Sequence, residues 1–308
     1  MKLAADNGAV HEGKLRAVAA IAQQALARRA LLDGALLRTE AALALTPRDS
    51  DLLYVRARAL EMWEEPTDLQ SCGARRRDRD AAQALRTLIE LDPSYEAMQT
   101  SFELGIVLTR DHAFAEAAHA YARSIELAWS PRDTAVAHSN MAEVTMLAGD
   151  PGAALVHYQR AIALSSGGRD YALSLFGLGV ALDRLGEHDK ALESCARGAE
   201  TGGRSLAVLE ADGVFFEPPY ERHYYLALGQ EALARLMPEA RALLLETARA
   251  EYDMFVALAP ESDPYRTAAR ANLESVQREL TALAKLPAAK PKAATKPARS
   301  SRPAASSR

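Results

Sequence analysis

The sequence has few of the residues that mark a secreted, metal-binding or membrane-spanning protein. Its 308 residues include only two cysteines, Cys72 and Cys195, which do not make a disulfide framework or a zinc site. No apolar run approaches the roughly 18 residues that a membrane-spanning helix needs. Residues 1–14 are too polar for a signal peptide. A cytoplasmic location is therefore the default expectation, and a trimmed exported form is left open.

The sequence also lacks the short motifs that mark catalysis or cofactor binding. It contains no phosphate-binding loop, dinucleotide-binding turn or nucleophile elbow. His11 and Glu12 begin like a metalloprotease motif, but Leu15 stands where the second histidine would be. The seven histidines are scattered, and no set of three or four metal ligands is visible. We therefore expect no enzyme activity, no metal and no cofactor.

Aromatic residues are scarce, at 6% of the chain, and much of the 49% hydrophobic content is alanine. This composition favours helices packed through small residues over a β-sandwich. Charge is unevenly distributed, because residues 285–308 contain seven Lys or Arg and no acid in a chain with a net charge of −4. The sequence thus predicts an acidic body followed by a basic tail.

A set of three residues recurs with a period of 37. Each set has a small residue, an alanine twelve positions later and a third residue four positions beyond: Gly105, Ala117 and Tyr121; Ala142, Ala154 and Tyr158; Gly179, Ala191 and Cys195. Apolar residues around them recur at steps of three and four, which predicts two amphipathic helices per unit that cross closely at the small residues. Cys195 takes the third place and is expected to be a buried thiol.

The order and spacing of these residues resemble the tetratricopeptide repeat, whose period is about 34 residues. The family pattern also places a proline twelve positions after the central alanine, as in Ala35 and Pro47, Ala81 and Pro93, and Ala248 and Pro260. The resemblance implies an all-α, right-handed solenoid of about six helix pairs over residues 15–286, with a polar-faced C-terminal capping helix. Residues 1–14 are then a lead-in, and residues 287–308 a disordered basic tail.

Local breaks refine this outline. Asp33 and Gly34 are expected to end the first helix, and residues 64–79 to form a polar loop whose basic run, Arg75 to Arg77, is solvated. A second insertion, residues 200–221, contains the run Val214 to Tyr220 with three aromatic residues and two prolines, which predicts an extended loop. These aromatics either fix the loop to the repeats or border a ligand groove.

The resemblance also implies a concave groove lined by the first helix of each unit. The candidate peptide-binding residues on it are Phe102, Arg110, Asn140, Glu143, Phe176, Asp183, Arg184 and Gln230. Family members that grip the C-terminal carboxylates of chaperones use a lysine and asparagine set, of which only Asn140 is present, so that function is not expected. Because aromatic and arginine side chains dominate binding hot spots, Arg184→Glu is expected to weaken binding and spare the fold.

These observations predict a protein-interaction adaptor or assembly scaffold that binds a peptide or partner helix in the groove. Two alternatives stay open. Residues 200–221 could form a small-molecule or enzyme-accessory site, or the basic tail could bind a polyanion such as nucleic acid or an anionic membrane surface. Specific nucleic-acid binding and membrane insertion are not expected. The sequence does not indicate the oligomeric state or the partner.

Overall fold

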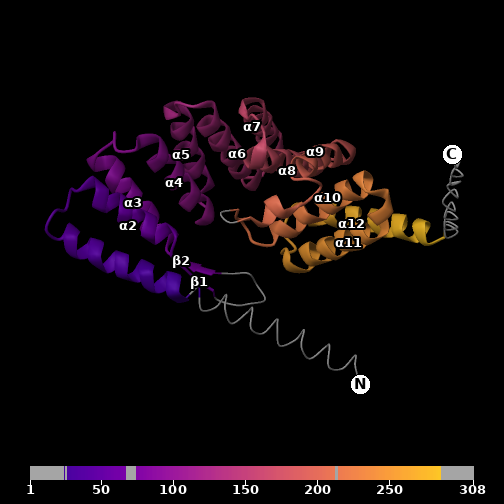
Figure 1. Ribbon diagram of the computed structural model, residues 1–308, viewed down its shortest axis with the longest axis horizontal. Helices are drawn as coiled ribbons and strands as arrows, with labels where there is room; N and C mark the ends of the chain where they lie inside the picture. Colours follow the sequence, from indigo (N-terminus) through magenta and orange to yellow (C-terminus); the bar gives the residue numbers. More distant parts are fainter. Residues whose placement is uncertain (1–23, 25, 67–73, 212–213, 286–308) are drawn as a thin grey trace, which may run out of the picture.

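The computed structural model describes residues 24, 26–66, 74–211 and 214–285. Over these residues it is a curved stack of helices with one small two-stranded hairpin (Figure 1). The predicted lead-in, the predicted tail and Cys72 lie outside the described residues. The expected all-α solenoid is therefore confirmed for the part of the chain that the structure describes.

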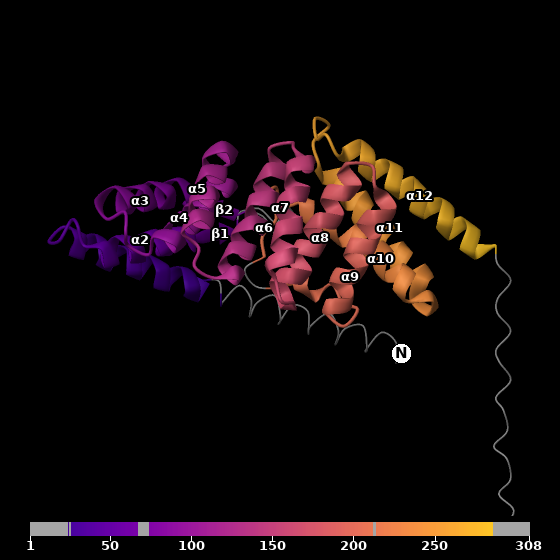
Figure 2. The same ribbon diagram turned by 90° about the horizontal axis from the view of Figure 1, so that it is seen from above.

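One helix, residues 26–43, precedes five helix pairs within the described residues. The pairs are α2 (Ser50–Glu61) with α3 (Asp78–Leu91), α4 (Ala97–Arg110) with α5 (Phe114–Leu127), α6 (Pro131–Leu147) with α7 (Pro151–Leu164), α8 (Gly168–Arg184) with α9 (His188–Thr201), and α10 (Glu221–Leu236) with α11 (Arg241–Leu258). Two short 3-10 turns, η1 (Ala207–Glu210) and η2 (Pro238–Ala240), lie in the connections. The last helix, α12 (Arg266–Ala284), packs on α11 at the end of the stack opposite α2 (Figure 2).

Turn residues define the helix starts in the regular part of the stack. The Asp150 carboxylate accepts a hydrogen bond from the Ala153 amide at 2.8 Å, and Pro151 occupies the first turn of α7. Ser130 and Pro131 begin α6 in the same way, with the Asp133 amide donating to the Ser130 hydroxyl at 3.1 Å. These caps satisfy amides that have no partner inside the helix, and proline loses nothing at a position that needs no donor.

The small residues of the 37-residue period lie at helix crossings, as predicted. A Cβ atom added at Gly179 would lie 2.4 Å from the Cys195 Sγ atom and 3.0 Å from the Ala191 carbonyl oxygen. At Gly105 it would lie 2.6 Å from the Tyr121 ring. In these two units the paired helices therefore approach too closely at the glycine for a side chain to fit without displacing its neighbours.

Two expectations for the N-terminal part are wrong. The first helix continues through Asp33 and Gly34 to residue 43, because a helix tolerates one glycine and Asp33 accepts a hydrogen bond from the Trp63 indole at 2.9 Å. The insertion is not only a loop, because its ends pair as antiparallel strands β1 (Glu64–Pro66) and β2 (Ala74–Arg76). Strands of three residues are too short to show an alternating pattern in the sequence.

Candidate binding site on the inner face

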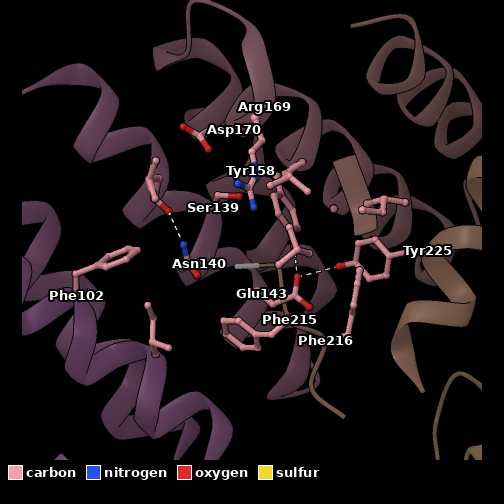
Figure 3. Close-up of a pocket in the computed structure, with 16 residues that line it drawn as sticks. Phe102, Ser139, Asn140, Glu143, Tyr158, Arg169, Asp170, Phe215, Phe216 and Tyr225 are labelled. Atoms are coloured by element: carbon pink, nitrogen blue, oxygen red, sulfur yellow. Dashed lines mark hydrogen bonds between the residues drawn. The ribbon is translucent and has the colours of Figure 1, made fainter. Parts of the chain in front are cut away.

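The first helices of successive pairs surround a cavity of about 300 Å³ (Figure 3). Its walls combine apolar and polar side chains from α4, α6 and α8 with residues from the loop before α10. Among the residues that line it are Phe102, Ile106, Asn140, Glu143, Leu173 and Phe215. The cavity thus lies on the helices that the resemblance assigned to the groove.

Glu143 of α6 holds the back of this cavity together. Its Oε2 atom accepts hydrogen bonds from the Tyr158 hydroxyl at 2.5 Å and the Tyr225 hydroxyl at 2.8 Å. Burial, together with the Glu143 charge, raises the pKa of both tyrosines far above its usual value, so both hydroxyls stay protonated and donate. Gly177 of α8 makes this possible, because a Cβ there would lie 2.3 Å from the Tyr158 ring.

The front of the cavity is more accessible. Phe102 is half-buried and lies edge-on against Tyr121, with 5.6 Å between the ring centroids. Asn140 donates a hydrogen bond through Nδ2 to the Val136 carbonyl at 3.0 Å. In Figure 3, Phe102 and Asn140 face the same space from α4 and α6. An apolar ring beside an amide suits a peptide, which presents apolar side chains and backbone polar groups together.

Residues 214–220, here called the strap, cross the inner face from α10 to the end of α4. The Phe215 ring lies 5.8 Å from the Arg110 guanidinium carbon, and the Phe216 ring lies 5.1 Å from the Tyr225 ring. The Glu217 Oε1 atom lies 3.2 Å from the His112 Nε2 atom. Phe215 and Phe216 therefore pack on the repeats and also border the cavity.

The structure brings together some of the predicted peptide-binding residues and separates others. Phe102, Asn140 and Glu143 surround the cavity, and Arg110 contacts the strap at its edge. Phe176 is fully buried and lies against Gly198 of α9. The remaining candidates, Asp183, Arg184 and Gln230, do not line the cavity.

Arg184 is part of the core. Its side chain has no exposed surface, forms an ion pair with Glu221, and stacks on the Tyr265 ring with 3.9 Å from the guanidinium carbon to the ring centroid. A ligand cannot reach this group without opening the stack. Arg184→Glu would place two carboxylates together in the interior, so the expectation that this substitution spares the fold is wrong.

Asp183 belongs to a second internal network. Its carboxylate accepts hydrogen bonds from Tyr224 and from the Asn272 amide at 2.9 Å, and it contacts the His188 Nδ1 atom at 2.6 Å. Burial favours neutral His188, but hydrogen bonds and charge from Asp183 and Glu231 outweigh it and raise the His188 pKa to about 10. A protonated His188 therefore joins α9 to α8 and α10.

Sequence reasoning missed the residues that complete the cavity. Tyr158 was recognised as a repeat position, but nothing in its spacing indicated a hydrogen bond to Glu143. Tyr225 had no signal at all, because its contact with Glu143 spans 82 residues. Among the described residues, no three His, Cys, Asp or Glu side chains gather as a metal site would require. None of the described helices is long and apolar enough to cross a membrane.

A stack of helix pairs with a ligand-sized hollow on its inner face defines an α-solenoid of the class whose members bind other proteins. Residues 133–197, which span most of α6 to α9, match the model of the tetratricopeptide repeat family. The resemblance is thereby confirmed for residues 133–197, which carry tetratricopeptide repeats.

Comparison with known proteins adds several similarities. No curated protein matches the chain. A crystal structure of MamA protein is 18% identical, with a TM-score of 0.46, covering 57% of this chain and 85% of that chain. YrrB, described as a TPR protein with an unusual peptide-binding site, is 20% identical, with a TM-score of 0.39, covering 76% and 97%. Yeast Tom70 is 16% identical, with a TM-score of 0.42, covering 80% and 43%. TM-scores below 0.5 add nothing to the argument about this chain's ligand.

Proposed function

We propose that the protein is an adaptor or assembly scaffold that binds a segment of a partner protein on its inner face. The observation that carries this proposal is the cavity between α4, α6 and α8, which lies on the first helices of the repeats and is bordered by Phe102, Asn140 and Glu143. Solenoids of this kind use such extended concave surfaces for binding.

The size and lining of the cavity favour part of a peptide over a free small molecule. Its volume of about 300 Å³ is at the lower end of the range for small-molecule sites. That space fits one or two side chains of a longer segment. Phe102, Ile106 and Leu173 would contact an apolar side chain, and the Asn140 amide would bond the peptide backbone beside it.

Site-specific cross-linking tests this proposal. A photo-reactive phenylalanine analogue replaces Phe102 at the cavity, or Val156 on α7 as a control. Val156 is 62% exposed and does not line the cavity. We expect cross-links to a discrete partner from position 102 and none from position 156. Asn140→Ala combined with the probe at 102 should weaken the cross-link.

Cross-links of equal yield from both positions, or from position 156 alone, would move the binding surface away from the inner face. The circular dichroism melt of each probe-carrying protein must match that of the wild type, so that loss of a cross-link is not loss of fold. Mass spectrometry of the adduct then identifies the bound segment.

A further inference from the structure

We infer that the strap occupies the inner face as an internal substitute for the partner, and that the site takes an extended segment with two adjacent aromatic residues followed by a carboxylate. This inference rests on the proposed function and names the chemistry of its ligand. The partner must displace residues 214–217 to bind fully. The strap is therefore a built-in competitor.

Each strap side chain meets a complementary group on a distant part of the fold. The Phe215 ring lies near the Arg110 guanidinium, an arrangement in which a cation is attracted to an aromatic ring. Phe216 lies edge-on to Tyr225 at an interplanar angle of 60°. Glu217 meets His112. Along the strap, two aromatic residues are followed by an acid. On the repeats, a guanidinium faces the first aromatic, a tyrosine faces the second and an imidazole faces the acid. This order of paired groups defines a recognition pattern.

The strap is attached by side chains. Among the described residues, no backbone hydrogen bond joins residues 215–217 to the helices. The side chains of Phe215 and Phe216 are only half-buried, and His112 at the outer end of the strap is 58% exposed. A segment that reproduces the three side-chain contacts can therefore replace the strap without breaking secondary structure. Displacement can begin at His112, the exposed partner of Glu217.

The position of the strap explains why its occupancy affects the cavity. Phe215 and Phe216 form one wall, opposite Phe102 of α4 and beside Glu143 of α6. A partner that enters the cavity alone meets a partly filled groove. A partner that displaces the strap contacts Arg110, Tyr225 and His112 as well as the cavity. It therefore binds a larger surface than a partner that only enters the cavity.

The test uses the full chain and a fluorescent synthetic peptide with the strap sequence Val-Phe-Phe-Glu-Pro-Pro-Tyr, corresponding to residues 214–220. The opened variant carries Phe215→Ser, Phe216→Ser and Glu217→Gln. A tethered segment has an effective concentration in the millimolar range, so the wild type should exclude the peptide. We expect fluorescence anisotropy to show at least ten-fold tighter peptide binding to the opened variant than to the wild type.

Two controls assign the contacts. A peptide with both phenylalanines replaced by serine should not bind the opened variant. Adding His112→Ala to the opened variant should weaken the Glu-containing peptide several-fold and leave a Gln-containing peptide unchanged. His112 suits this purpose because its side chain is 58% exposed, and a circular dichroism melt checks that the variant stays folded.

Equal peptide affinity for the wild type and a folded opened variant would overturn the inference. If the opened variant does not fold, the single variant Glu217→Gln, which changes only the contact with His112, must still raise peptide affinity. No increase would show that the strap is a permanent structural part. A cross-link from position 102 to a partner that persists while the peptide fails would overturn the inference and leave the proposed function standing.

Discussion

The units α4/α5 and α8/α9 lie two periods apart and carry the same residue types at matched positions, yet the structure uses them differently. Phe102 matches Phe176, and Arg110 matches Arg184. Phe102 is half-buried at the cavity, whereas Phe176 is fully buried. Arg110 pairs with Asp78 at 2.6 Å and reaches the strap, whereas Arg184 pairs with Glu221 inside the stack.

The helix crossing next to each phenylalanine accounts for the difference. In the α8 unit, Cys195 and Gly198 are small, and the Phe176 ring occupies the recess against Gly198. In the α4 unit, the large Tyr121 ring occupies the crossing, so Phe102 lies edge-on against it and stays at the surface of the groove. The comparison shows that a repeat position fixes which face a residue is on. The size of its neighbours then decides whether that residue is core or binding surface.

The largest expected effect is on the phenylalanine pair. Phe176→Ala should lower the free energy of unfolding by about 3–5 kcal/mol, because it leaves a cavity in a fully buried crossing. Phe102→Ala should cost less than half as much, because water already reaches that side chain. It should also lower the affinity for the partner that the cross-link identifies. Urea unfolding of both variants measures the difference. Equal losses would mean that Phe102 is a core residue and that the two units are alike.

A second prediction concerns a position at which the two units should agree. Gly105→Ala and Gly179→Ala should each cost about 1–3 kcal/mol, since the added methyl group meets Tyr121 in one unit and Cys195 in the other. Gly34→Ala is the control: its added Cβ would lie 3.7 Å from the nearest atom, an ordinary contact, and alanine favours helix. Thermal melts should show Gly34→Ala unchanged or slightly stabilised. A loss at Gly34 equal to that at Gly179 would contradict the crossing argument.

The 37-residue period was sufficient to predict the stack, because small residues at helix crossings recur in the sequence as well as in space. The resemblance to the tetratricopeptide repeat, rather than the period itself, implied that Phe102, Asn140 and Glu143 lie on the inner face. It could not separate Phe102 from Phe176, because that distinction depends on residues of the second helix, Tyr121 and Cys195, which the groove positions do not include.

The contacts that close the site come from outside the repeat pattern. Glu221 is the last residue of the insertion and Tyr225 follows it, and the strap reaches His112 across more than one hundred residues of sequence. Periodicity carries no information about such contacts, since they depend on how an irregular segment folds back. The composition of the strap did indicate that its aromatics would be partly covered, but not which surface would cover them.

The two regions should also lose stability over different pH ranges. Near α4, burial and the neighbouring Glu103 charge, opposed by Arg58, raise the pKa of Glu61 from 4.5 to about 8. Near α8, Asp183 and Glu231 raise the pKa of His188 from 6.5 to about 10 despite its burial. A group whose pKa is higher in the folded state stabilises that state below the unfolded pKa, and the stabilisation is lost as pH rises through the folded value.

The Glu61 contribution should therefore disappear between about pH 4.5 and 8, and the His188 contribution between about pH 6.5 and 10. The positions two periods before Asp183 and His188 are Thr109 and Phe114, so the α4 unit has no counterpart of the second network. Above pH 8, we expect hydrogen exchange to accelerate in α8 to α10 more than in α4 and α5. The loss should be on the order of 1 kcal/mol, because His188 is partly exposed to solvent.

His188→Gln is the matched variant, since glutamine keeps a hydrogen-bond donor and has no charge to lose. In this variant the exchange rates of α8 to α10 should no longer rise above pH 8 relative to those of α4 and α5. The imidazole of the wild type, followed by NMR, should titrate well above pH 8. If His188 titrates near its ordinary pKa of 6.5, or if the variant keeps the wild-type pH dependence, the charged network does not stabilise the α8 unit. The contrast between the two units would then depend on packing alone, through Cys195 and Gly198 on one side and Tyr121 on the other.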